Sequence, residues 1–141
     1  MIINKIFLDA NILLDMIDKD RGNIEKSRDL IYRALMKDIL LFTSCDILSN
    51  VYYVANRKLE KVEVIQEIDR MLEIFDIVPI DNTLAQKAMK MNVLDIRLDF
   101  EDLLQSVCAE EASCDLIVTN DKQFVSGLVQ HVTLDKALEL I

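Results

Sequence analysis

Three aspartates stand where a strand is expected to end or a helix to begin. Asp9 follows the first apolar run directly, Asp121 lies two residues beyond another such run, and Asp102 falls in the first turn of an expected helix. Two like charges about 4 Å apart repel by about 4 kcal/mol near a protein surface, and a bound cation offsets that cost. Hard divalent ions such as Mg²⁺ or Mn²⁺ prefer carboxylate oxygens, and they can activate water for phosphoryl chemistry. Taken alone, each aspartate could be only a helix N-cap.

The elements that must position these acids alternate along the chain. Short apolar runs at 2–8, 39–43, 77–80 and 116–119 predict buried strands, and Val132 predicts a further edge strand. Helical spacing predicts helices at 11–18, 23–37, 46–58, 62–75, from 81 or 82 onward, at 101–111 and from 134 onward. The helix at 62–75 is expected to be amphipathic, and its apolar face consists of Val64, Ile65, Ile68, Met71 and Leu72.

This alternation predicts a three-layer α/β/α sandwich with a short, mostly parallel sheet. Parallel neighbouring strands end at one edge of the sheet, so Asp9 and Asp121 are expected on the same side of the molecule. Ligands of such sheets bind beyond the carboxyl ends of the strands.

Composition narrows the class of protein. The 141 residues fit a single domain, 52% of them are hydrophobic, and the 2 Gly and 1 Pro leave no room for a flexible linker. Charges interrupt every apolar run and no secretory signal is visible, so we expect a cytoplasmic protein without a membrane segment. Three cysteines, an odd number without a CxxC pair, predict buried free thiols, and the single histidine, His131, makes a zinc site implausible. No glycine-rich phosphate loop and no Gly-x-Ser-x-Gly elbow is present.

Three segments, in order and at matching spacing, resemble the motifs of PIN-domain proteins. They are residues 7–15 (FLDANILLD), 102–109 (DLLQSVCA) and 116–124 (LIVTNDKQF). The likeness covers nearly the whole chain, so residues 1–141 are expected to be a single PIN-like domain.

The resemblance implies a Mg²⁺- or Mn²⁺-dependent ribonuclease, often the toxin of a VapC-type toxin–antitoxin pair. By motif match, Asp9, Asp102 and Asp121 would be the catalytic metal ligands, and Asn11 and Thr119 would support them. The implied partners are an RNA substrate and an antitoxin protein. Exposed apolar helices would also allow a homodimer.

One position departs from the family pattern. Asn50 stands where the second motif carries an acid, usually Glu, so the site is expected to bind metal more weakly. Asp46, one turn earlier, could substitute only if its side chain points the same way. Asp99 and Glu101 are nearby acids that could assist, although a solvated helix start, where the dipole favours acids, is the better explanation of both.

Three functional hypotheses follow. The first is the metal-dependent endoribonuclease. The second is a non-catalytic PIN-like module that binds RNA or a protein, which Asn50 and the net charge of −9 favour. The third is a phosphate-accepting receiver-like domain, and the lack of a suitably placed lysine after a last strand argues against it.

Overall fold

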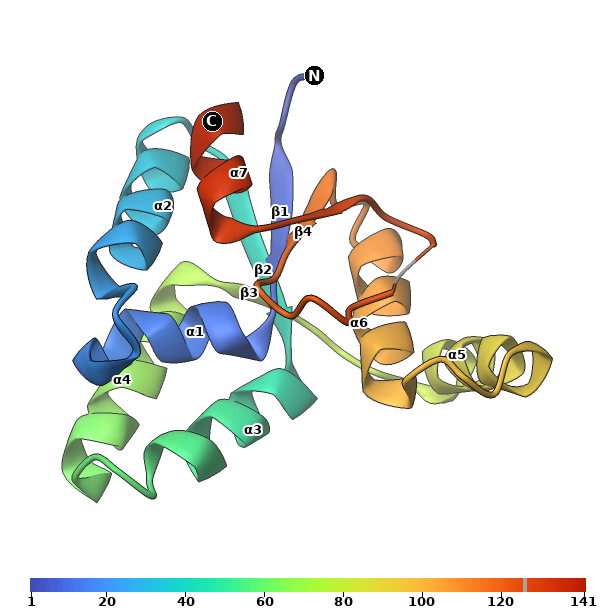
Figure 1. Ribbon diagram of the computed structural model, residues 1–141, viewed down its shortest axis with the longest axis horizontal. Coiled ribbons are helices and arrows are strands. Elements are labelled where there is room, and N and C mark those ends of the chain that lie inside the picture. Colours follow the sequence, from blue (N-terminus) through green and yellow to red (C-terminus); the bar gives the residue numbers. More distant parts are fainter. Residues whose placement is uncertain (126) are drawn as a thin grey trace.

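A five-stranded parallel sheet forms the centre of the molecule. The computed structural model describes residues 1–125 and 127–141, and it orders the strands β3-β2-β1-β4-β5 (Figure 1). The strands are β1 (Lys5–Leu8), β2 (Leu40–Ser44), β3 (Asp76–Val78), β4 (Leu116–Val118) and β5 (His131–Val132). Every pair of neighbouring strands is parallel, and Phe7 of β1 pairs with Phe42 on one side and Ile117 on the other. The middle of the sheet is continuously apolar because helices cover both of its faces.

Seven α-helices and one short 3-10 helix are built from the described residues. They are α1 (Ala10–Ile17), η1 (Lys19–Arg21), α2 (Ile24–Met36), α3 (Cys45–Ala55), α4 (Lys61–Ile74), α5 (Asn82–Leu94), α6 (Phe100–Glu111) and α7 (Leu134–Leu140). Figure 1 shows α1, α2 and α7 on one side of the sheet and α6 on the other, with α5 packed outside α6. The predicted three-layer sandwich is confirmed.

The predicted strands and helices are all present, with bounds that differ by up to three residues. Two details are wrong. Ile65 and Leu72, expected on the apolar face of α4, are 49% and 52% exposed. The face that packs against the core is narrower than expected: Val64 and Met71 are buried, and Ile68 is partly buried. Cys45 is exposed at the start of α3, whereas Cys108 and Cys114 are buried free thiols as predicted. Among the described residues, no helix combines the length and apolar character needed to cross a bilayer.

Candidate metal centre at the carboxyl end of the sheet

Asp9 is fixed where β1 passes into α1. Its backbone N–H donates to the carbonyl of Val118 at 3.1 Å, which continues the β1–β4 pairing by one residue. Its side chain is the N-cap of α1, with Oδ1 accepting from the Ala10 N–H at 2.6 Å. Oδ2 accepts from Thr119 Oγ1 at 2.7 Å and from Asn11 Nδ2 at 2.8 Å. A buried carboxylate, here 6% exposed, is held in one orientation by these donors.

Thr119 connects Asp9 to the second predicted acid. The N–H of Asp121 donates to Thr119 Oγ1 at 3.1 Å, and Asp121 Oδ1 accepts from the Gln123 N–H at 2.9 Å. Asn11 bridges the same loop, because its Oδ1 accepts from the Asn120 N–H at 3.0 Å. The structure therefore brings Asn11 and Thr119 into contact with the acids that they were expected to support.

Asp102 approaches from the other side of the sheet, in the first turn of α6. Asp99 is the N-cap of this helix and accepts from the Asp102 N–H at 3.1 Å. Burial raises the pKa of Asp102 to about 7, and repulsion from Asp99, Asp121 and Asp9 adds to the rise, while the Val125 N–H opposes it. Asp9 and Asp121 are therefore close enough to Asp102 for their charges to disfavour its ionised form.

A pocket of about 290 Å³ collects these side chains from α1, α3, α6 and the loop after β4. Its lining consists of Asp9, Ala10, Asn11, Leu14, Asp46, Ile47, Asn50, Glu101, Asp102, Gln105 and Asp121. We call it the acidic pocket. Of the predicted site residues, only Thr119 and Asp99 are outside its lining. Thr119 is buried behind Asp9, and Asp99 caps α6.

Two polar lining residues were not among the predicted site residues. Asp46 lies one turn before Asn50 on α3, lines the same pocket and accepts a short hydrogen bond from Ser44 Oγ. Its offset of four residues from Asn50 made it a possible substitute in the sequence, since residues at i and i+4 share a helix face, and the structure places both in the lining of one pocket.

Gln105 is the second. It is 6% exposed, and its Oε1 has no hydrogen-bond partner within the part of the chain that the structure describes. It follows Asp102 by three residues on α6, in a stripe that is otherwise apolar or small. A buried amide oxygen without a partner is costly, so such an atom at the wall of a polar pocket is typical of a site that takes a ligand or ordered water.

The ligand atoms in the pocket are of the type that hard divalent cations prefer, but they are too far apart to coordinate one ion together. Carboxylate and amide oxygens line the pocket without histidine or cysteine, which favours Mg²⁺ or Mn²⁺ over zinc. Across residues 1–125 and 127–141, no three His, Cys, Asp or Glu side chains stand close enough together to hold an ion as they are placed. Burial first, and then the charges of Asp99, Asp121 and Asp9, raise the pKa of Asp102, and a bound cation would offset the repulsive part of that rise.

A parallel sheet with an acidic pocket at its carboxyl edge defines a class of fold, and similarity to known proteins identifies that class. The PIN domain family model matches residues 6–126, and this chain belongs to that family. It is 33% identical over 136 residues to a protein named Ribonuclease VapC1 from Aquifex aeolicus (strain VF5), which covers 96% of this chain and 94% of the relative.

Solved structures share the fold at low sequence identity. A DNA-bound VapBC from Salmonella typhimurium superposes with a TM-score of 0.72 at 15% identity, covering 92% of this chain and 98% of the other. VapC20 from Mycobacterium tuberculosis, described as a toxin that cleaves the sarcin-ricin loop, gives 0.69 at 13% identity, with 84% and 92% covered. The predicted resemblance is confirmed.

Proposed function

We propose that this chain is a divalent-metal-dependent endoribonuclease and the toxin of a VapC-type toxin–antitoxin pair. The observation that carries the proposal is the acidic pocket, in which Asp9, Asp102 and Asp121 arrive from three different elements at the carboxyl edge of a PIN-domain sheet. The relative named Ribonuclease VapC1 supports RNA as the substrate class. Structural neighbours described as VapBC and toxin–antitoxin complexes support an antitoxin as partner.

In this proposal Asp9, Asp102 and Asp121 hold Mg²⁺ or Mn²⁺. An ion bound there would activate a water and would offset the charge that develops on the phosphodiester during its hydrolysis. Thr119 and Asn11 both donate hydrogen bonds to Oδ2 of Asp9, and these bonds fix the orientation of the carboxylate. Glu101 and Asp46 lie in the pocket wall, where either carboxylate can orient a water by accepting a hydrogen bond from it.

Three further statements belong to the same proposal. Residues 1–141 act as one PIN-like unit, the protein works in the cytoplasm, and exposed apolar side chains on α4 and α5 allow a homodimer. These exposed side chains include Val62, Ile65, Leu72, Met89 and Val93.

Cleavage of RNA tests the proposal directly. The purified protein is incubated with structured RNAs and Mn²⁺ beside Asp9→Asn and Asp121→Asn variants, and an Asp29→Asn variant serves as a control. Asp29 loses the same charge but lies on α2, in an ion pair with Arg33 outside the acidic pocket. We expect cleavage by the wild type and the control, and none by the two site variants. Equal cleavage by all four would show that a contaminant, not this site, cuts the RNA.

Asn50 favours a second candidate, a PIN-like module that binds without cutting. Its amide lines the acidic pocket at the position where the family pattern has an acid, so the pocket has one charge fewer there. Calorimetry with Mn²⁺ separates the two candidates. Binding in the micromolar to low millimolar range supports the nuclease, and no heat at millimolar Mn²⁺ supports the binding module.

A further inference from the structure

A second pocket adjoins the acidic pocket and differs from it in charge. Its volume is about 540 Å³, and it is lined by Asn11, Asp15, Arg21, Asn23, Asn120 and Asp121. We call it the arginine pocket. Asn11 and Asp121 line both pockets, so a chain-like ligand that crosses one can continue into the other. Every lining residue is polar, which suits a charged or hydrogen-bonding ligand and not an apolar one.

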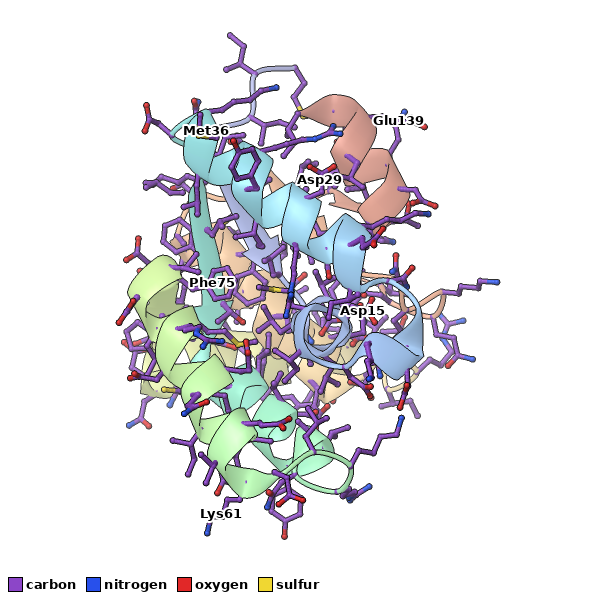
Figure 2. All side chains as sticks on the ribbon, turned by 90° about the vertical axis from the view of Figure 1, so that its left-hand side faces the viewer. Asp15, Asp29, Met36, Lys61, Phe75 and Glu139 are labelled. Atoms are coloured by element: carbon purple, nitrogen blue, oxygen red, sulfur yellow. The ribbon has the colours of Figure 1, made fainter. Side chains whose placement is uncertain are left out.

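Arg21 is held in place from behind. It ends η1, and its Nε donates to Asp15 Oδ1 at 2.7 Å while Nη2 reaches the Asn11 carbonyl at 3.5 Å. The side chain of Asp15 is only 4% exposed, and its other oxygen accepts from Asn23 Nδ2 at 3.3 Å. Asp15 is one turn after Asn11 on α1, so both face this pocket; Figure 2 labels Asp15 on that helix. The carboxylate is therefore buried, whereas the arginine side chain remains 33% exposed.

The exposed edge of this guanidinium is suited to phosphate. A guanidinium has five N–H donors in a planar fork, and the contacts above use only two of its nitrogens. Phosphate oxygens accept from such a fork in pairs. Among the described residues, Arg21 is also the only lysine or arginine that lines either pocket. An RNA that reaches the acidic pocket, in a protein of net charge −9, therefore meets one preorganised cation beside it.

We propose that the arginine pocket is a subsite for the RNA backbone, in which Arg21 binds a phosphate neighbouring the one that is cleaved. The inference rests on the proposed ribonuclease function, because it assumes that RNA enters the acidic pocket. Arg21 is a substrate-binding residue in this account, and Asp15 is a positioning residue that fixes the guanidinium without touching the RNA.

A purely structural ion pair is the alternative, and single substitutions of Arg21 cannot exclude it. Removing Arg21 alone would leave the buried Asp15 carboxylate with only the neutral Asn23 amide as a partner, which destabilises a fold whether or not RNA binds there. The informative comparison is between Asp15→Asn, which keeps the arginine, and the double variant Asp15→Asn/Arg21→Gln, which removes it without stranding a buried charge. Equal melting temperatures for these two variants show that any difference in RNA binding is not a folding defect.

Arg33→Gln provides a matched control. Arg33 also pairs with an aspartate, Asp29, at 2.9 Å and donates to a backbone carbonyl, that of Leu138, at 3.1 Å. It lies on α2, one turn beyond the Asp29 labelled in Figure 2, and lines neither pocket. Its substitution removes the same charge from the protein as a whole.

The measurement is the salt dependence of RNA binding. Fluorescence anisotropy follows a short labelled single-stranded RNA with Ca²⁺ in place of Mg²⁺, and a gel confirms that the RNA is intact after each titration. Each phosphate contact to single-stranded nucleic acid contributes about 0.7 to the slope of log K against log salt concentration. Relative to Asp15→Asn, we expect the double variant to have a slope that is smaller by about 0.7 and to bind RNA roughly tenfold more weakly at low salt. Arg33→Gln should keep the slope of the wild type.

The possible results separate this inference from the proposed function. An unchanged slope in the double variant, with RNA cleavage by the wild type intact, overturns the role of Arg21 and leaves the nuclease assignment standing. If the wild type neither binds nor cleaves RNA with any divalent ion, the proposed function fails and the subsite fails with it. A slope loss as large in Arg33→Gln as in the double variant also overturns the inference, because it reflects overall charge only.

Discussion

Replacing Asp102 with Asn should stabilise the metal-free protein at neutral and alkaline pH. In the folded chain the pKa of Asp102 is raised from 3.8 to about 7, first by burial and then by the charges of Asp99, Asp121 and Asp9. The ionised carboxylate is therefore disfavoured by the fold. Its cost is absent below about pH 4, where the group is protonated in both states, and it grows as the pH rises toward 7.

The size of the effect follows from that shift. Three pKa units at about 1.36 kcal/mol each give about 4 kcal/mol as an upper limit for the penalty above pH 7. Asp102 is only partly buried, so solvent screening lowers the penalty to about 3–4 kcal/mol. Asn keeps the shape but loses the charge that accepts from the Val125 N–H and that favours the first turn of α6, together about 1–2 kcal/mol. We expect a net stabilisation of about 1–3 kcal/mol, or several degrees in melting temperature for a domain of this size.

Urea denaturation in EDTA between pH 4 and pH 8 measures this difference. Glu63→Gln is the control, since Glu63 also lies in the first turn of a helix but is exposed on α4, outside the pocket. The advantage of Asp102→Asn should be near zero at pH 4 and reach its maximum above pH 7. In Mn²⁺ the order should reverse, because the wild type gains stability from the bound ion and the variant gains less. A variant that is destabilised at pH 8 in EDTA, or equally affected at all pH values, would refute the electrostatic account of the pocket.

Three more predictions concern the same edge of the sheet and the core beneath it. Asn50→Asp should bind Mn²⁺ about tenfold more tightly by calorimetry and melt lower in EDTA, whereas Asp46→Asn should do the opposite; equal affinities would exclude both residues from the metal site. Thr119→Val removes the hydroxyl between Asp9 and Asp121 and should cost about 1–3 kcal/mol in urea, with exposed Thr83→Val as a neutral control. Ile117→Ala empties a fully buried position of β4 and should cost about 2–5 kcal/mol; a loss under 1 kcal/mol would contradict the packing described.

The sequence was sufficient for the layout of the sheet and for the acids at its edge. Strands such as 116–118 are continuously apolar because both faces are buried, and that pattern is readable without coordinates. Asp9 and Asp121 were predictable partners because parallel strands β1 and β4 end at one edge. Asp102 stood out only as an acid at a helix start, because its approach depends on how α6 packs across the opposite face; the family resemblance then implied that it joins the other two.

The arginine pocket was beyond sequence reasoning for a different reason. An isolated Asp15 in an apolar helix indicates a buried charge that needs a partner, but nothing local identifies Arg21 as that partner. Their contact requires the chain to turn back through η1, a 3-10 helix that no periodicity predicts, and Gly22 at φ 84° closes the turn. Only glycine adopts this backbone region without strain, so the turn brings Arg21 onto α1 at little cost.

The departure at Asn50 changes the distribution of charge in the site more than its amount. Asp46 and Asn50 are one helical turn apart on α3, and both line the acidic pocket. An acid is thus still supplied by α3, but from the first turn of the helix, where the N-terminal dipole stabilises a negative charge. Asn50 meanwhile contributes an amide oxygen without adding to the repulsion that already raises the pKa of Asp102. Compared with a pocket that also has an acid at position 50, this pocket has less repulsion between carboxylates when no cation is bound. It still offers an α3 carboxylate, that of Asp46, to an ion that enters.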